Sequence, residues 1–420
     1  MNIVIVLGTY YPNPSPTALV ADQMIQFYKK THKVYVICQK NNKDNENRDN
    51  EKEKGIIKIE IGNTIAQFER WIQIMSRKRN RIQRGIFQII SRIVFPIKVL
   101  KNIMVFPNGE QWYINKANGI LEKINKDVGI DCLITVCAPF SAHVAGYHFK
   151  ENHEDIKWCV YTPDVFSEGI RANKNALYRA LQYKRAIHWE DMIYSKADWI
   201  VHMDRVFESH ENVKSDRSRS MVLYTQMQFF NAARNNDNYH KDVICLYAGS
   251  FLPGIREPFF MVEAFSALFY DHPEIKLALY GNLGYTSYFE SFRNKYPNNV
   301  VLHEPVSKRE LAEIIEKATF LINVGNSTEG FIPSKIYEYV ATGIPIITFS
   351  YTGRDNLTLL RYPMHYQVNT MDTNTKEAIK GLALFISKSK FKRVDHETLN
   401  KIYNEHTREV YEQKLNEIID

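Results

Sequence analysis

Apolar runs alternate with segments of helical spacing from the start of the chain. The run Asn2–Leu7 predicts a buried strand, the apolar spacing within Thr17–Lys30 predicts a helix, and Lys33–Cys38 predicts a second strand. A strand, helix and strand in this order imply a parallel sheet with right-handed crossovers. Beyond the polar loop Asn41–Lys54, the same pattern predicts further strands at Ile56–Ile61, Asp131–Val136, Trp158–Tyr161 and Trp199–Met203.

A second alternating series follows the polar stretch Asn231–His240, which has no periodicity and is the best candidate for a linker. Its predicted strands are Val243–Tyr247, Lys276–Tyr280, Val300–His303, Phe320–Val324 and Pro345–Ser350. Its predicted helices are Phe259–Phe269, Tyr285–Lys295, Lys308–Lys317 and Ser334–Ala341. We therefore predict an α/β chain of two tandem Rossmann-like, doubly wound domains, with ligands beyond the carboxyl ends of the strands. The expected bounds are 1–235 and 236–400, with 401–420 as a terminal helix that packs back on the first domain.

Composition narrows the class of protein and of partner. The 420 residues are 45% hydrophobic and 24% charged, which excludes a disordered or fibrous chain. The net charge of +7 suits an anionic partner: a phosphate ligand, an acidic membrane or nucleic acid. The five cysteines include no CxxC pair, so buried thiols are favoured over disulfides or metal ligation. With no signal peptide pattern and no run of about 18 apolar residues, we expect a cytoplasmic protein.

Common catalytic motifs are missing from the sequence. Gly249 and Gly254 have Walker A spacing, but Ile255 and Arg256 follow where Lys and Ser or Thr are needed. No GxGxxG follows the first strand, and no HExxH, GxSxG or spaced Cys/His cluster occurs. We predict neither a metal site nor a bound cofactor.

The stretch Glu329–Pro345 is the most informative one, because it follows an apolar strand and enters a helix at Ser334. The N-terminus of a helix can bind phosphate. Lys335 in the first turn is unfavourable for the helix dipole, which favours a role for Lys335 in contacting an anion. Glu338 lies on the same face as Ser334, where a carboxylate can accept hydrogen bonds from a ribose diol. The alternative is a capped helix with a charged turn, in which Glu338 pairs with Lys335.

This stretch, PSKIYEYVATGIPII, resembles the second domain of the GT-B nucleotide-sugar glycosyltransferases, specifically the retaining family 4 type. The resemblance extends to Tyr247–Ser350, and more thinly to TYYPNPSPTALVADQM and DCLITVCAPFSAHVAGYHFK in the first domain. It implies two domains that face a cleft, metal-independent transfer and a nucleoside-diphosphate sugar as donor. The residues that it places at the donor are Gly8, Thr17, Gly249, Ser250, Arg256, Gly281, His303, Gly330, Phe331, Ile332, Ser334, Lys335 and Glu338.

Two positions depart from the family pattern. The family separates its two motif glutamates by seven residues, whereas eight residues separate Glu329 from Glu338, so Gly330 stands where the first glutamate belongs. Either Glu329 replaces the family's first motif glutamate, or the backbone amides of Gly330–Ile332 perform its function. Many members also carry Arg where this chain has Ser250, which leaves Arg256 and Lys335 to neutralise the diphosphate. For Arg256, the alternative is a surface salt bridge with Glu257.

The first domain contributes two further candidates by resemblance. His143, near the start of a helix, is predicted to bond a sugar hydroxyl or move a proton, and its alternative is a capping or core histidine. Asp164 follows a strand and is predicted to face the acceptor hydroxyl. At Gly8, a larger side chain is expected to clash near the diphosphate.

Residues 70–101 carry nine basic side chains and no acid, interleaved with apolar ones. This pattern resembles an amphipathic element on an anionic bilayer, and its alternative is a solvated helix packed on its own domain. Nucleic acid is disfavoured because no binding motif accompanies the stripe. We therefore expect transfer to a lipid-linked or other glycan acceptor of the cell surface, at the inner face of the membrane. The rival interpretations are a GT-B epimerase and a catalytically silent subunit that binds a partner enzyme.

Overall fold

The computed structural model divides into two compact units, one of Met1–Thr225 with Tyr411–Asp420 and the other of Gln226–Val410. The structure describes residues 1–12, 14–40, 53–62, 100–102, 104–107, 109–163, 165–171, 176–203, 217–224, 226–227, 242–326, 335–351, 357–369 and 375–420. The predicted linker Asn231–His240 and nearly all of the basic stripe at 70–101 lie outside these residues.

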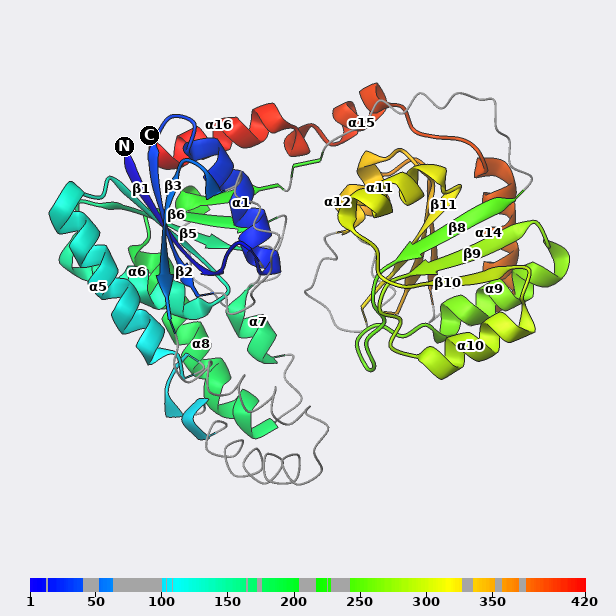
Figure 1. The fold of residues 1–420 in the computed structure, drawn as a ribbon, viewed down its shortest axis with the longest axis horizontal. Coiled ribbons are helices and arrows are strands. Elements are labelled where there is room, and N and C mark those ends of the chain that lie inside the picture. The colour runs from blue at the N-terminus through cyan, green and yellow to red at the C-terminus, as the bar shows by residue number, and fades with distance from the viewer. Residues whose placement is uncertain are drawn as a thin grey trace. The chain divides into compact units, whose positions relative to one another are not determined.

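The first unit is built on a sheet of seven described strands in the order β3-β2-β1-β4-β5-β6-β7. In Figure 1, α1 and α5 lie on opposite sides of this sheet. All neighbouring strands in it run parallel. The strands are β1 (Asn2–Thr9), β2 (Lys33–Gln39), β3 (Ile56–Ile61), β4 (Cys132–Val136), β5 (Lys157–Thr162), β6 (Trp199–Met203) and β7 (Ser220–Leu223).

Helices cover both faces of this sheet, and a buried apolar layer lies under each set. Residues of α1 and α16 share one layer, whereas residues of α5, α6 and α8 share the other. The helices are α1 (Pro16–Tyr28), α5 (Gln111–Val128), α6 (Phe140–Asn152), α7 (Phe166–Arg171), α8 (Ala176–Lys196), the short η2 (Arg217–Arg219) and α16 (Arg408–Ile419).

The end of the chain is tied to the first unit by backbone carbonyls of α16. The Tyr28 hydroxyl donates to the carbonyl of Leu415 over 2.7 Å, and the Lys157 ammonium donates to that of Ile419 over 3.0 Å. Because the last carbonyls of a helix lack partners within it, the Lys157 donor at Ile419 stabilises the end of α16. Tyr411–Asp420 therefore completes the apolar layer over α1.

The second unit repeats the plan with six described parallel strands in the order β10-β9-β8-β11-β12-β13. The strands are β8 (Val243–Ala248), β9 (Ile275–Tyr280), β10 (Val300–His303), β11 (Phe320–Val324), β12 (Ile346–Ser350) and β13 (His365–Asn369). The helices are α9 (Phe259–Asp271), α10 (Thr286–Lys295), α11 (Lys308–Lys317), α12 (Lys335–Ala341), α13 (Leu357–Leu360), α14 (Thr375–Ser389), α15 (His396–Ile402) and the short η3 (Asn404–His406).

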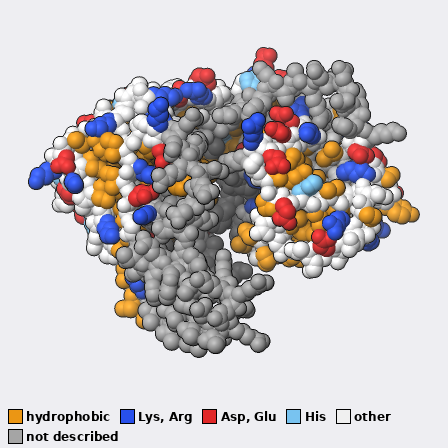
Figure 2. Space-filling model, viewed as in Figure 1, with side chains coloured by type: hydrophobic (Ala, Val, Ile, Leu, Met, Phe, Trp, Pro, Cys, Tyr) orange, Lys and Arg blue, Asp and Glu red, His pale blue; other side chains and the backbone are white. Residues whose placement is uncertain are grey.

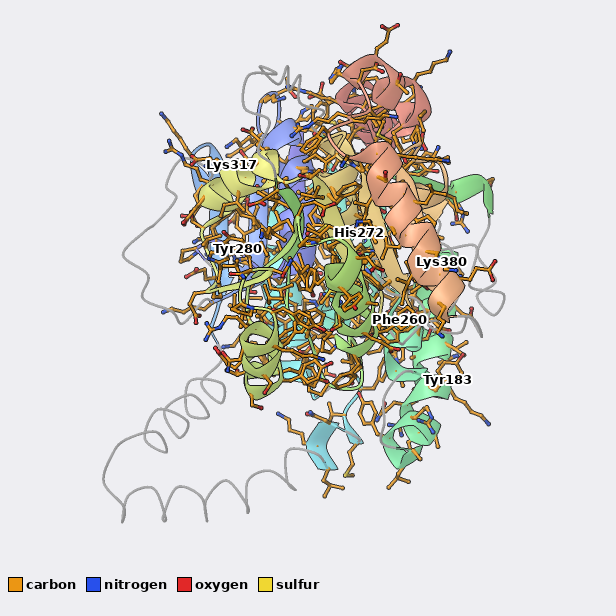
Figure 3. The ribbon with its side chains drawn as sticks, turned by 90° about the vertical axis from the view of Figure 1, so that its right-hand side faces the viewer. Tyr183, Phe260, His272, Tyr280, Lys317 and Lys380 are labelled. Atoms are coloured by element: carbon orange, nitrogen blue, oxygen red, sulfur yellow. The ribbon has the colours of Figure 1, made fainter. Side chains whose placement is uncertain are left out.

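Figure 3 shows α11, which ends at Lys317, and α14, which carries Lys380, on opposite sides of the second sheet. The face under α9 and α14 is packed with aromatic and aliphatic side chains, among them Phe265, Phe269 and Leu382. Where this unit meets solvent, hydrophobic side chains lie among charged ones (Figure 2).

Both sheets have the strand order of a Rossmann fold, which confirms the predicted fold class. The order reverses between β1 and β4 in the first unit and between β8 and β11 in the second. Ligands of such sheets bind beyond the carboxyl ends of the strands at this reversal. Gly8 in the first unit and Gly249 in the second lie at these ends.

Two further findings bear on the sequence predictions. All five cysteines fall within the described residues, where each is buried and none forms a disulfide. Among the helices that the structure describes, none is both long and apolar enough to cross a bilayer.

Candidate functional site

Two glycines bring the loops after β8 and β9 into contact. Gly281 has a φ of +126°, and a Cβ on it would lie 2.3 Å from the carbonyl oxygen of Gly249. In turn, the Gly249 amide donates to the carbonyl of Tyr280 over 2.9 Å. Only glycine tolerates both this conformation and this approach, so the pair fixes a bare backbone surface at the end of β8.

Two cations converge on the same turn of backbone. The Arg256 guanidinium donates from Nε to Asn326 Oδ1 over 3.1 Å and from Nη1 to the Ser250 carbonyl over 3.4 Å. The Lys335 ammonium, at the start of α12, donates to the Ala248 carbonyl over 2.5 Å. Both charges therefore flank Gly249, as an anion site at the strand reversal requires.

Arg256 keeps hydrogen-bonding capacity for a ligand. A guanidinium has five N–H donors; the contacts with Asn326 and Ser250 use two of them, and the Tyr247 hydroxyl is a third partner among the described residues. Among the described residues no carboxylate forms an ion pair with Arg256, because the neighbouring Glu257 bonds the amide of Gly254 instead. The predicted alternative, a salt bridge between Arg256 and Glu257, is thus not formed in the structure.

Glu338 is exposed on the outer face of α12. The pairing with Lys335 that the sequence left open is not seen, because the Lys335 ammonium reaches the carbonyl of Ala248. An exposed carboxylate one turn from the helix start can accept hydrogen bonds from a diol. Its predicted role toward a ribose stays a prediction.

His303 stacks on Tyr280 at the ends of β10 and β9. Their ring centroids lie 4.0 Å apart with planes inclined by 9°, and both rings are half-buried. Figure 3 labels Tyr280 within the second unit. Burial lowers the pKa of His303, which favours the neutral form of the ring. Such a flat pair offers a π surface beside the glycine turn, and the sequence identified only His303 of the two.

In the first unit, Gly8 and Thr17 meet at one carbonyl. A Cβ on Gly8 would lie 2.9 Å from the Ala138 oxygen, and the Thr17 hydroxyl donates to this oxygen over 3.3 Å. Ser15 caps α1 by accepting from the amide of Ala18. Glycine is therefore required at position 8 by the loop after β4, independently of any ligand.

His143 lies inside the core of the first unit with no exposed surface. Its Nδ1 lies 2.8 Å from the Thr135 hydroxyl, and its Nε2 lies 3.3 Å from the Thr162 hydroxyl. Burial lowers its pKa to about 3, so the ring is neutral. This geometry matches the alternative of a core histidine, and a role on the substrate stays a prediction.

The remaining predicted site residues lie outside the residues that the structure describes: Asp164, Glu329, Gly330, Phe331, Ile332 and Ser334. Their roles stay predictions. Among the described residues, no group of three or more His, Cys, Asp or Glu side chains is arranged to hold a metal ion.

Sequence reasoning missed the residues that orient the candidates. Asn326 after β11 holds the Arg256 guanidinium, and Tyr280 supports His303. Separately from these candidates, Glu190 of α8 has no exposed surface, accepts a hydrogen bond from the amide of Ser167 over 3.0 Å, and has its pKa raised to about 7 by burial. For Asn326, the only signal in the sequence was its position directly beyond a strand at the reversal.

Comparison with known proteins agrees with this architecture. Residues 242–361, which include β8–β12, match the family model described as "Glycosyl transferases group 1". No curated protein sequence matches the chain.

Solved structures similar to the chain include a glycosyltransferase from Rickettsia africae ESF-5, with a TM-score of 0.63 and 13% identity over 100% of this chain and 97% of that one. HepE from Anabaena, solved with UDP-glucose, gives a TM-score of 0.61 and 8% identity over 99% and 98% of the two chains. WaaG, "a glycosyltransferase involved in lipopolysaccharide biosynthesis", gives a TM-score of 0.56 and 13% identity over 99% of each chain.

At these identities the structural matches show the fold, and that fold is GT-B. The family model matches residues 242–361, inside the second unit, so this unit is similar to the group 1 glycosyltransferase domain.

Proposed function

We propose that the protein transfers a sugar from a nucleoside-diphosphate sugar to a glycan acceptor, without a metal and with retention of anomeric configuration. The observation that carries the donor part is the convergence of Arg256 and Lys335 on the carbonyls that flank Gly249. HepE, whose fold this chain shares, is solved with UDP-glucose, which supports a nucleotide-sugar donor.

The proposed chemistry follows from charge. As the bond to the sugar breaks, negative charge develops on the leaving diphosphate, and preorganised cations stabilise it. The Arg256 guanidinium supplies this charge with N–H donors to spare, and the Lys335 ammonium adds a second cation. The Glu338 carboxylate accepts hydrogen bonds from the ribose hydroxyls, and the stacked rings of His303 and Tyr280 flank the base.

The retaining outcome and the acceptor rest on the family resemblance and on the sequence. Asp164 and Glu329 are the proposed catalytic residues, with Glu329 or the backbone at Gly330 in the place of the family's first motif glutamate, whereas the ring of His143 has no exposed surface with which to touch a substrate. WaaG is a glycosyltransferase involved in lipopolysaccharide biosynthesis, which supports a cell-surface glycan as acceptor. The departures at Ser250 and Gly330 favour one rival, a silent subunit.

Donor hydrolysis separates an active enzyme from a silent subunit, and Glu338→Ala tests the proposed ribose contact. We expect slow hydrolysis of the donor by the wild type and a loss of roughly 10–100-fold in donor affinity in the variant, because hydrogen bonds to a charged group are worth about 1.5–3 kcal/mol. The variant should also lose any preference for a ribose over a 2′-deoxyribose nucleotide. Isothermal titration with both nucleotides measures this preference.

The matched control is Glu313→Ala, which removes an exposed carboxylate from the neighbouring helix α11. It should leave affinity and hydrolysis unchanged. Absence of hydrolysis with every donor despite normal nucleotide binding would favour the silent subunit. An unchanged ribose preference in Glu338→Ala would contradict the proposed contact.

We propose that the basic stripe at 70–101 holds the protein on an anionic membrane, near a lipid-linked acceptor. At about 1 kcal/mol for each basic residue, the loss of four should weaken vesicle binding by roughly 10²–10³-fold. The test is sedimentation with phosphatidylserine vesicles after replacement by Glu of Arg77, Lys78, Arg79 and Arg81. Equal vesicle binding by this variant and the wild type would exclude the stripe as the contact.

The control reverses four exposed lysines that lie away from the stripe: Lys123, Lys126, Lys376 and Lys380. It produces the same change in net charge. Vesicle binding in the control should fall much less than in the stripe variant, because the effect depends on where the charge lies.

A further inference from the structure

The loop between β8 and α9 carries Arg256 and projects an apolar tip into solvent. Leu252 and Ile255 in this tip are 47% and 39% exposed. The tip closes on itself, since Leu252 and Arg256 exchange backbone hydrogen bonds of 3.0 and 2.8 Å. Burial therefore contributes little to holding the tip, and the position of Arg256 depends on how the two ends of the loop are anchored.

The first anchor is Phe251, which is 1% exposed. Its ring stacks on that of Tyr247 with centroids 4.4 Å apart and lies 5.3 Å from that of Phe289. Gly284, in the loop between β9 and α10, packs closely against the same residue: a Cβ on it would lie 2.7 Å from the Phe251 carbonyl oxygen. This end of the loop is held by apolar packing.

The second anchor is polar and centres on Glu257. Its carboxylate accepts the amide of Gly254 over 2.5 Å and also the hydroxyl of Tyr285, directly before α10. Its backbone carbonyl accepts the hydroxyl of Tyr351, directly after β12. One residue thus joins the loop tip to two other segments of the unit.

The role of the Glu257 carboxylate depends on whether it pairs with Arg256 or with other groups of the loop. Glu257 neighbours Arg256 in sequence, and an ion pair between them would neutralise the charge that the donor needs. In the structure the carboxylate is occupied by Gly254 and Tyr285, while Arg256 reaches Asn326 and the carbonyl of Ser250. The acid therefore fixes the loop and leaves the guanidinium to face the end of β8.

We propose that Glu257 is a positioning residue, which through Gly254, Tyr285 and Tyr351 holds the loop in the conformation that places Arg256 at the diphosphate. This inference rests on the proposed function, because it assigns Glu257 its effect through the donor contact of Arg256. Its effect should therefore appear only with ligands that carry the diphosphate and only while Arg256 is present.

The test is a double-mutant cycle on the full chain with Arg256→Ala, Glu257→Ala and the double variant. Isothermal titration measures affinity for whichever of UDP, GDP and ADP binds most tightly and for its parent nucleoside. We expect Glu257→Ala to weaken the diphosphate by about tenfold and the nucleoside by less than twofold. In the double variant, affinity should equal that of Arg256→Ala alone, because residues that act through one contact are not additive.

Conservative variants separate positioning from general damage to the unit. Glu257→Gln keeps an acceptor for Gly254 and should recover most of the lost affinity, and Tyr285→Phe should reproduce part of the loss. Glu290→Ala, which removes an exposed carboxylate paired with Arg293, is the matched control and should match the wild type.

Equal weakening of nucleoside and diphosphate, or additive losses in the double variant, would overturn the inference and leave the proposed function standing. The same holds if Arg256→Ala weakens the diphosphate and Glu257→Ala does not. If none of the three nucleotides binds the wild type, the proposed function fails and the inference falls with it.

Discussion

Replacing Arg256 with alanine should weaken binding of a nucleoside diphosphate by roughly 10–100-fold and leave the nucleoside nearly unaffected. The guanidinium is held by Asn326 and the Ser250 carbonyl with further N–H donors available, and contacts with a charged ligand are worth about 1.5–3 kcal/mol. Turnover should fall at least as far, because the same cation stabilises the charge that develops on the leaving group. Titration calorimetry with the two ligands measures the first effect.

Two matched variants sharpen this prediction. Arg256→Lys keeps the charge but loses the planar fork that bonds Asn326 and Ser250, so its affinity should lie between those of the wild type and the alanine variant. Arg309→Ala removes a side chain that is 93% exposed on α11 and should change nothing. If the ratio of diphosphate to nucleoside affinity stays constant in Arg256→Ala, then Arg256 does not contact the diphosphate.

Gly281→Ala should damage both the stability and the donor site of the second unit. A φ of +126° is strained for alanine, and its Cβ would lie 2.3 Å from the Gly249 oxygen. The strained conformation alone costs on the order of 1–3 kcal/mol. Since the clash can be relieved only if the two loops separate, the bare backbone beside Arg256 and Lys335 should be lost, and with it measurable nucleotide affinity.

Scanning calorimetry of the full chain measures the destabilisation of Gly281→Ala, and titration calorimetry measures the lost affinity. Gly119→Ala is the control, because this glycine lies inside α5 with nothing within 4 Å of an added Cβ. It should leave stability unchanged or raise it by about 0.5–1 kcal/mol. Wild-type stability in Gly281→Ala would show that the loops are not pressed together as described.

The sequence predicted the fold because the signal for it is repeated along the chain. Each buried parallel strand is a nearly continuous apolar run, and loops such as Gly249–Pro258 interrupt the runs at regular intervals. The position of the two predicted cations also followed, since the loops after parallel strands lie at the carboxyl edge of the sheet. Arg256 and Lys335 reach the end of β8 through the carbonyls of Ser250 and Ala248.

Side-chain direction was beyond the reach of the sequence. The pattern places His143 near a helix start, but only the packing of α6 on β4 and β5 shows that its ring points inward, between the hydroxyls of Thr135 and Thr162. Likewise, an acid next to Arg256 predicts an ion pair between the two. In the structure, the Glu257 carboxylate instead accepts a hydrogen bond from the hydroxyl of Tyr285, which is distant in sequence. Such contacts depend on residues that are brought together only by the fold.

The most direct test of the account is titration calorimetry of the purified full chain with UDP, GDP and ADP and with their parent nucleosides. The central claim is that the backbone at Gly249, with Arg256 and Lys335, binds a diphosphate. It predicts that at least one nucleotide binds, and at least tenfold more tightly than its nucleoside. If all three fail to bind, or bind no better than the nucleosides, the claim is contradicted.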